Sequence, residues 1–160
     1  PGFGFCDRAL GGRGAGKEGG KISPGTLALM PGALLQFAPD TRVQASGAAE
    51  DPQYKVQAGL EYLISYEGMG RSLLRCVRHC SCKEQRLDAH STSRVHNESV
   101  FVRHFFTIRG ASARCSLSLL LLNESSSGGH KFKVRSLFIA SGDGGAQRLW
   151  QRMDRPDMGT

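Results

Sequence analysis

The amino-acid sequence predicts an all-β fold, an antiparallel β-sandwich of the jelly-roll kind, and three observations lead to this prediction. Apolar and polar residues alternate along several stretches of the 160-residue chain, which is the pattern of a half-buried strand. The chain contains 21 glycines, well above the usual share, and this favours many turns. About eight strands follow one another at intervals of about 10 to 15 residues, without a convincing helical period between them. A parallel α/β fold is therefore not expected.

The chain divides into three segments within a length that suits about one domain, so a large multi-domain enzyme is excluded. Residues 1–20 carry closely spaced glycines among charged residues and bury too little apolar surface to offset their ordering entropy. They are predicted to be a flexible arm or linker. Residues 21–141 are predicted to form the sandwich domain, and residues 142–160 a short C-terminal tail.

The first strands of the domain are expected at Thr26–Met30 and Ala33–Ala38, because the turn-forming pair Pro31–Gly32 separates two apolar stretches. The clearest strand is Tyr54–Ile64, where every second residue is apolar and most residues between them are polar. Its predicted core face consists of Tyr54, Val56, Ala58, Leu60, Tyr62 and Ile64.

Four further strands and one weaker candidate complete the predicted sandwich. Ser99–Arg109 has apolar residues on both faces, so it is expected to be covered on both sides of its sheet. Ala113–Leu122 places Cys115 and alternate leucines on one face and serines on the other. The other strands are expected at Ser72–His79 and His130–Ala140, with residues 84–91 as the weaker candidate.

Four of the five cysteines lie within forty residues of one another, which predicts two disulfides in an oxidising compartment. Three pairings are possible, and the sequence does not separate them. A zinc site that adds His79 or His90 is less favoured, because C-x3-C-x-C is not the paired C-x2-C spacing of zinc knuckles. No metal or cofactor is therefore predicted. The four residues are Cys76, Cys80, Cys82 and Cys115, and Cys6 remains as an odd thiol.

The chain has only two asparagines, Asn97 and Asn123, and both stand in N-x-S glycosylation sequons. Together with the clustered cysteines they indicate a secreted, extracellular or Golgi-lumenal glycoprotein. The alternative is that both asparagines are unmodified turn residues.

The net charge of +7 favours acidic partners without choosing among them. The longest apolar run, Leu119–Leu122, is too short for a membrane span. Most aromatic residues fall at core spacing, so a nucleic-acid partner is not predicted. Basic residues around the cysteine-bearing strand either hold an acidic sugar chain, together with Tyr66, or form a solvated face. They are Arg71, Arg75, Arg78, Lys83 and Arg86.

No catalytic residue is predicted. Asp88 and His90 would share one face of a strand, but no G-x-S-x-G elbow supplies a nucleophile. Glu61 and Glu67 are the only carboxylates expected near a sandwich rim, which is little basis for the acid pair of a glycosidase.

Two turn-like segments, Ser65–Gly70 and Ser125–Lys133, are the more distinctive candidates for a site. In a functional interpretation both lie at one rim and bind a glycan through Tyr66, Glu67, His130 and Lys131. In a structural interpretation Glu67 accepts backbone amides and the glycines supply positive φ.

The blocks L-x-Y-L-x-S-Y-E-x-M-G, C-x3-C-x-C and L-N-E-S-S-S-G-G-H-K-F-K-V, in this order, resemble a domain of plant and algal proteins. In those proteins it commonly follows an SGNH/GDSL-type hydrolase-like domain of secreted or Golgi-lumenal proteins akin to the capsule-associated group. The resemblance covers about Lys21–Ala140. It implies a non-catalytic, carbohydrate-associated β-sandwich with disulfides among the four clustered cysteines. The Gly-Asp-Ser and Asp-x-x-His blocks of the hydrolase are absent from the chain.

The leading hypothesis is an extracellular or lumenal module that binds a polysaccharide or other glycan, or packs on an adjacent domain or subunit. One alternative is an accessory fragment of a polysaccharide O-acyl esterase or transferase. Another is a structural subunit of an extracellular assembly, with Phe101, Phe105, Leu120 and Leu122 forming an outward interface.

Overall fold

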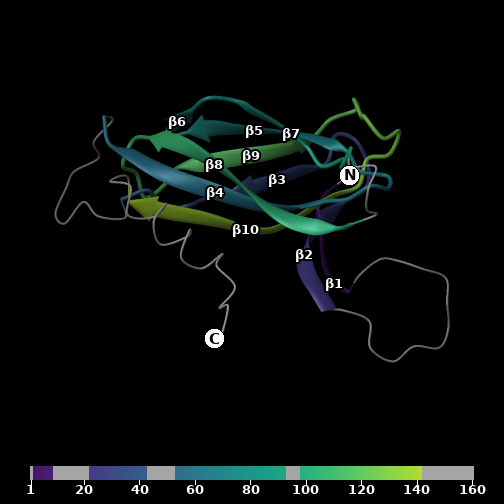
Figure 1. Cartoon of the computed structure of the whole chain (residues 1–160). Coiled ribbons are helices and arrows are strands. Elements are labelled where there is room, and N and C mark those ends of the chain that lie inside the picture. Colours follow the sequence, from purple (N-terminus) through teal and green to yellow (C-terminus); the bar gives the residue numbers. More distant parts are fainter. Residues whose placement is uncertain (1, 9–21, 43–52, 93–97, 142–160) are drawn as a thin grey trace, which may run out of the picture.

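The computed structural model describes residues 2–8, 22–42, 53–92 and 98–141, which form two antiparallel sheets (Figure 1). The predicted all-β class and the sandwich of two sheets are confirmed. The six-stranded sheet has the order β1-β2-β10-β4-β8-β6 and the four-stranded sheet the order β3-β9-β5-β7. The strands are β1 (Gly4–Arg8), β2 (Ile22–Ala28), β3 (Leu34–Phe37), β4 (Lys55–Ile64), β5 (Arg71–Arg78), β6 (Ser81–Cys82), β7 (Gln85–Asp88), β8 (Val100–Arg109), β9 (Ser116–Leu121) and β10 (Phe132–Ser141).

Most consecutive strands lie in different sheets. With β1 and β6 set aside, each sheet keeps four strands, in the orders β2-β10-β4-β8 and β3-β9-β5-β7. This arrangement is compatible with the predicted jelly roll, which also has eight strands in two sheets. The predicted turn at Pro31–Gly32 contains a left-handed glycine, with φ of 82° at Gly32. It joins β2 to β3 and therefore carries the chain from one sheet to the other rather than closing a hairpin.

The core lies between the two sheets, and the period-two pattern of the sequence identifies it. The face of β4 that was predicted to be apolar is buried at Val56, Ala58 and Leu60. The four-stranded sheet contributes alternate leucines of β9, as its sequence pattern indicates, and residues of the neighbouring strands. The largest buried side chains from that sheet are Leu74, Leu117, Leu119 and Leu121.

The N-terminal part of the chain differs from its prediction. Residues 1–20 are predicted to be a linker, whereas Gly4–Arg8 within them form β1 and pair with β2. Phe3 packs against the hydrophobic core, so this end of the chain does have apolar surface to bury. Residues 9–20 and the predicted tail at 142–160 lie outside the described residues.

Two disulfides connect the sheets near β6. Cys76 of β5 is bonded to Cys82 of β6, and Cys80 is bonded to Cys115, just before β9. Because β6 pairs with β8, the first bond ties an edge of the six-stranded sheet to the four-stranded sheet. The structure thus selects one of the three possible pairings. Two disulfides fit a compartment outside the reducing cytosol.

Candidate functional site

The two turn-like segments, which share a rim in the functional interpretation of the sequence, lie side by side. Met69 forms a parallel bridge with Lys131, and the Gly70 amide donates to the Lys131 carbonyl at 2.9 Å. A Cβ atom on Gly129 would stand only 2.4 Å from the Cα of Gly68, so the two backbones are in direct contact. The structure therefore brings together the loops that carry the four predicted ligand-binding residues.

Those four residues are engaged to different degrees. Tyr66 and Glu67 are exposed, and neither side chain makes a hydrogen bond to another described residue. The backbone-bracing role suggested for Glu67 is thus not seen there, whereas Gly68 does have a positive φ, 64°. His130 is held in place because its Nε2–H donates to the Asn123 carbonyl at 3.0 Å. Lys131 is half-buried beside the bridge.

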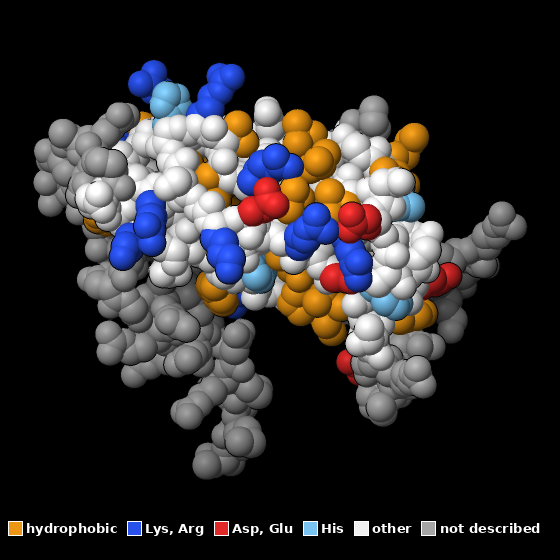
Figure 2. Space-filling view, turned by 90° about the horizontal axis from the view of Figure 1, so that it is seen from above, with side chains coloured by type: hydrophobic (Ala, Val, Ile, Leu, Met, Phe, Trp, Pro, Cys, Tyr) orange, Lys and Arg blue, Asp and Glu red, His pale blue; other side chains and the backbone are white. Residues whose placement is uncertain are grey.

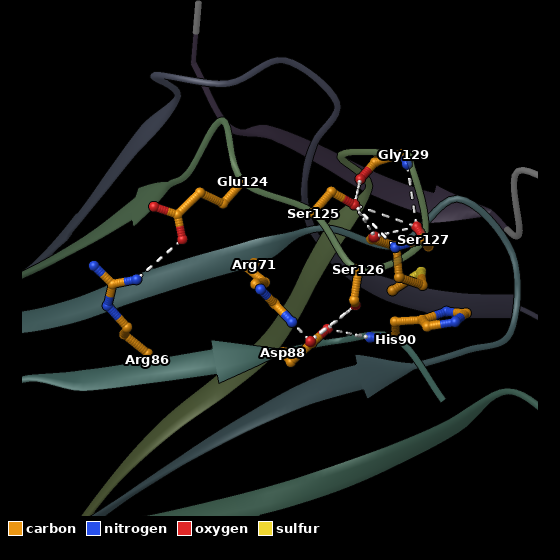
Figure 3. Close-up of polar contacts among 10 residues, drawn as sticks. Arg71, Arg86, Asp88, His90, Glu124, Ser125, Ser126, Ser127 and Gly129 are labelled. Carbon is orange, nitrogen blue, oxygen red and sulfur yellow. Dashed lines mark hydrogen bonds and ion pairs between the residues drawn. The ribbon is translucent and has the colours of Figure 1, made fainter. Parts of the chain in front are cut away.

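In the serine-rich loop between β9 and β10, the hydroxyls of Ser125 and Ser127 form hydrogen bonds with neighbouring backbone groups (Figure 3). Ser125 and Ser127 both donate to the Met69 carbonyl. The Ser125 hydroxyl also accepts the Ser127 amide, and the Ser127 hydroxyl accepts the Gly129 amide. These contacts fix the loop, and they leave few of its polar groups for a ligand.

Asp88 is also used structurally, so the Asp88–His90 pair does not form part of a catalytic triad in the described residues (Figure 3). Its carboxylate accepts the His90 amide at 3.0 Å, Arg71 Nε at 2.7 Å and the Ser126 hydroxyl. Burial would raise the pKa of Asp88, but these three donors together lower it below 3.8. The His90 ring is not among the partners of Asp88, and its Nδ1 is buried without a described partner.

Only one of the two glycosylation sequons can be placed. Asn123 is exposed at the end of β9, where a glycan would meet solvent. Asn97 lies outside the described residues. Whether either sequon carries a glycan stays a prediction.

The outward side of the six-stranded sheet carries a second candidate, which we call the aromatic–cationic face. Its aromatic residues are Phe101, Phe105 and Phe138, and its cations are Arg135, which stacks on Phe101, and Arg103, which lies over Phe138. Phe138 of β10, Gly59 of β4 and Phe105 of β8 are register partners across three adjacent strands. A Cβ on Gly59 would lie 3.1 Å from Phe105 Cε1 and 3.3 Å from Phe138 Cδ2, so the two rings cover this glycine from both sides. Phe105 nevertheless remains 47% exposed. The result is an aromatic surface that faces solvent.

A groove of about 590 Å³ begins at Phe105 and runs along the ends of β4 and β8. Its floor includes Gln57 and Thr107, whose side chains are joined by a 3.1 Å hydrogen bond. Polar groups in the groove can therefore orient a ligand beside the aromatic ring. The residues that line it are Lys55, Gln57, Ser81, Cys82, Lys83, Gln85, Phe105, Phe106, Thr107 and Arg109.

One wall of the groove depends on β6 and β7. Ser81 and Cys82 pair with Arg109 and Ile108 of β8, and the Cys76–Cys82 bond fixes this wall to the other sheet. Gln85 of β7 is held by His104 of β8, with Nε2 of the imidazole 3.0 Å from the amide oxygen. Burial lowers the pKa of His104, because it disfavours the charged form of the ring.

Beyond the aromatic pair, the same face contains a nearly buried carboxylate. Glu61 accepts the Ser136 hydroxyl at 3.0 Å and lies 3.6 Å from Arg103 and 3.9 Å from Arg135. Arg135 also stacks on Phe101, with 3.4 Å from its guanidinium carbon to the ring centre. Glu61 is thus neutralised within the sheet, which argues against a role as a free catalytic acid.

Sequence reasoning placed Phe101 and Phe105 on an outward interface but did not find the aromatic–cationic face, because the face exists only once the register of β10, β4 and β8 is known. One signal was available: Gly59 interrupts the middle of the clearest strand, and glycine there often marks a close approach by a neighbour. A second was the prediction that Ser99–Arg109 is covered on both faces. β8 does bury Phe106 and Ile108 inward, but the predicted cover on its other face is not seen, because Phe105 points outward and is 47% exposed.

Two kinds of feature, a cluster of metal ligands and a membrane-spanning helix, are absent from the described part of the chain. No group of three or more His, Cys, Asp or Glu side chains in it is placed to hold a metal ion. Within the same ranges, no helix has the length and apolar composition needed to cross a bilayer.

Comparison of the chain with protein-family models, with curated proteins and with solved structures gives no match. The resemblance to the plant and algal domain therefore stays an expectation.

Proposed function

We propose that this domain is a non-catalytic carbohydrate-binding module of the secretory or extracellular space, and that it binds a glycan chain across the aromatic–cationic face. The observation that carries the proposal is the solvent-facing ring of Phe105, which packs with Phe138 over Gly59 and is continuous with a polar groove. A sugar ring has apolar C–H faces and hydroxyl edges. An aromatic surface flanked by amide and hydroxyl groups matches both.

The composition of the groove favours binding over hydrolysis. Its lining residues include no Asp, Glu or His, so it lacks a pair of groups that could act as general acid and base. The proposed location is supported by the two disulfides, which are typical of oxidising compartments. The exposed sequon at Asn123 is consistent with the same route.

Substitution of Phe105 tests the proposal. We expect Phe105→Ala to lower retention in affinity electrophoresis through gels that contain soluble polysaccharides, because it removes the exposed aromatic ring beside the groove. The matched control is Val100→Ala on the same strand, since Val100 is equally exposed, at 46% against 47% for Phe105. The control should migrate like the wild type. Failure of the wild-type protein to be retarded by any neutral or charged polysaccharide would contradict the proposal.

The alternative, packing on a neighbouring domain or subunit, has one observation in its favour. Leu29, Met30 and Leu34 are exposed at 56%, 63% and 46% around the connection from β2 to β3. Such apolar clusters often lie at protein interfaces. The double substitution Leu29→Ser with Met30→Ser should leave polysaccharide retention unchanged if these residues serve only a protein contact.

A further inference from the structure

Three basic side chains line the groove, and the groove has no acidic residue among its lining. Lys55, Lys83 and Arg109 are all exposed, and none forms an ion pair with another described residue. Charges on the outward side of the four-stranded sheet are arranged differently: Figure 2, seen from the side of β5 and β7, shows acidic side chains directly beside basic ones. The ion pairs there are Arg71–Asp88, Arg75–Glu84 and Arg86–Glu124.

Two of the groove cations are placed where they repel each other. Lys55 of β4 and Arg109 of β8 are direct register partners at the end of the antiparallel pair. Like charges directly opposite each other on neighbouring strands destabilise a sheet. The outward positions of the four-stranded sheet avoid such a conflict by pairing cations with carboxylates. An anion that lies between Lys55 and Arg109 would remove the repulsion.

Among the residues that the structure describes on this face, the carboxylate nearest to Lys55 in sequence is not available for that purpose. Glu61 lies six positions further along β4 than Lys55, a separation of about 20 Å along a strand. It is also already engaged by Ser136, Arg103 and Arg135. Within the described part of the chain, the positive charge of the groove is therefore left for a ligand.

We propose that the groove selects an anionic polysaccharide, one that carries carboxylate groups of uronic acids or sulfate esters. The inference rests on the proposed carbohydrate-binding function and names its ligand class. An acidic group lies between Lys55 and Arg109, where the guanidinium can donate two parallel hydrogen bonds to a pair of oxygens. The sugar ring stacks on Phe105, and Lys83 contacts a second acidic group from the wall formed by β6. From Phe105 to Arg109 the strand extends about 13 Å, so the groove accepts a chain rather than a single ring.

Matched polysaccharides separate charge from sugar identity. The carboxylate arm compares polygalacturonate with fully methyl-esterified pectin, which has the same backbone without its charge. The sulfate arm compares κ-carrageenan with agarose. We expect the wild-type protein to bind at least one charged member roughly tenfold or more tightly than its neutral counterpart, since each charged hydrogen bond contributes strongly. The preference should weaken as salt is raised from 50 to 500 mM.

Charge-removing variants locate the preference in the groove. Lys55→Gln with Arg109→Gln should lose roughly tenfold or more in affinity for the charged polymer and little for the neutral one. The control is Arg75→Gln with Arg86→Gln, which removes the same two charges from the outward side of the other sheet. It should keep the preference. Lys55→Glu tests the repulsion: it should abolish binding of the charged polymer while the melting temperature stays equal or rises.

Three other results would contradict one or both proposals. Equal affinity for charged and neutral polymers, or an equal loss in the Arg75/Arg86 control, overturns the anionic selectivity and leaves the carbohydrate-binding function standing. Binding of a single-stranded oligonucleotide as tightly as the charged polysaccharide overturns the saccharide assignment of the groove. If no polymer of any kind is bound, both proposals fail.

Discussion

Thr41 shows how much one buried hydroxyl can organise. Its Oγ1 lies 2.7 Å from the Gly110 carbonyl and accepts the Ser112 amide at 2.8 Å, while its own amide donates to the Ser112 carbonyl. Gly110 has a φ of 103° and directly follows Arg109, so this turn fixes the end of β8. A single side chain thus anchors the strand that carries one wall of the groove.

Replacement of this hydroxyl should destabilise the fold. We expect Thr41→Val to lower the free energy of unfolding by about 1 to 3 kcal/mol, because it removes the oxygen that accepts a buried amide. Urea unfolding, followed by far-UV circular dichroism, measures the change in the free energy of unfolding. Thr41→Ser keeps the hydroxyl and should lose clearly less; equal losses in the two variants would show that the methyl group, not the oxygen, matters.

His104 gives the fold a pH dependence whose sign follows from burial. Its pKa in the folded protein is below the ordinary 6.5, because burial disfavours the charged ring. As pH falls below 6.5, His104 becomes protonated in the unfolded chain but stays neutral in the folded chain. The free energy of unfolding should therefore decrease until the pH reaches the pKa of His104 in the folded state. Melting temperatures between pH 7.5 and 5 should drop more steeply for the wild type than for His104→Gln. Parallel curves would contradict this.

At the scale of single elements, β6 depends on its covalent links. It has two residues, pairs with β8 through both, and is held between two disulfides. An isolated strand of this length would not persist. Its position is what gives the groove a wall, so we expect the disulfides to contribute to the proposed binding as well as to stability.

Removal of one disulfide should therefore affect mainly stability, and removal of the other mainly polysaccharide affinity. Cys80 and Cys115 are 35 positions apart and Cys76 and Cys82 only 6. Loop-closure entropy then assigns about 4 kcal/mol to the first bond and about 2 kcal/mol to the second. We expect Cys80→Ala with Cys115→Ala to lose more stability, and Cys76→Ala with Cys82→Ala to lose more polysaccharide affinity, because Cys82 lines the groove. Urea unfolding and gel retardation of both variants check this, and the reverse ranking would contradict it.

Over the whole molecule, the sequence predicts the strands and their buried faces, which follow from local alternation. It does not predict contacts that depend on how distant strands pair. Alternation in Tyr54–Ile64 correctly identified the buried face of β4, because a strand exposes its period directly in the residue order. The cysteine pairing and the aromatic–cationic face require the relative placement of strands that are far apart in the chain.

The same limit explains the basic cluster that surrounds the cysteine-bearing strand. The sequence offered it as a holder of an acidic sugar chain or as a solvated face. Arg71, Arg75 and Arg86 prove to be paired with carboxylates from other segments, whereas Lys83 lines the groove. The two rim loops lie together, as the functional interpretation of the sequence requires, since Gly68 and Gly129 touch. Whether that rim binds a ligand stays a prediction.

Gly59 leads to a consequence for any saturation-mutagenesis survey of this domain. The aromatic surface exists because this position has no side chain, and even a methyl group would press on both phenylalanine rings. Selection for polysaccharide capture should therefore enforce glycine there as strictly as it enforces Phe105. Such a survey should then find few tolerated substitutions at Gly59, although this residue offers the ligand no side-chain atom.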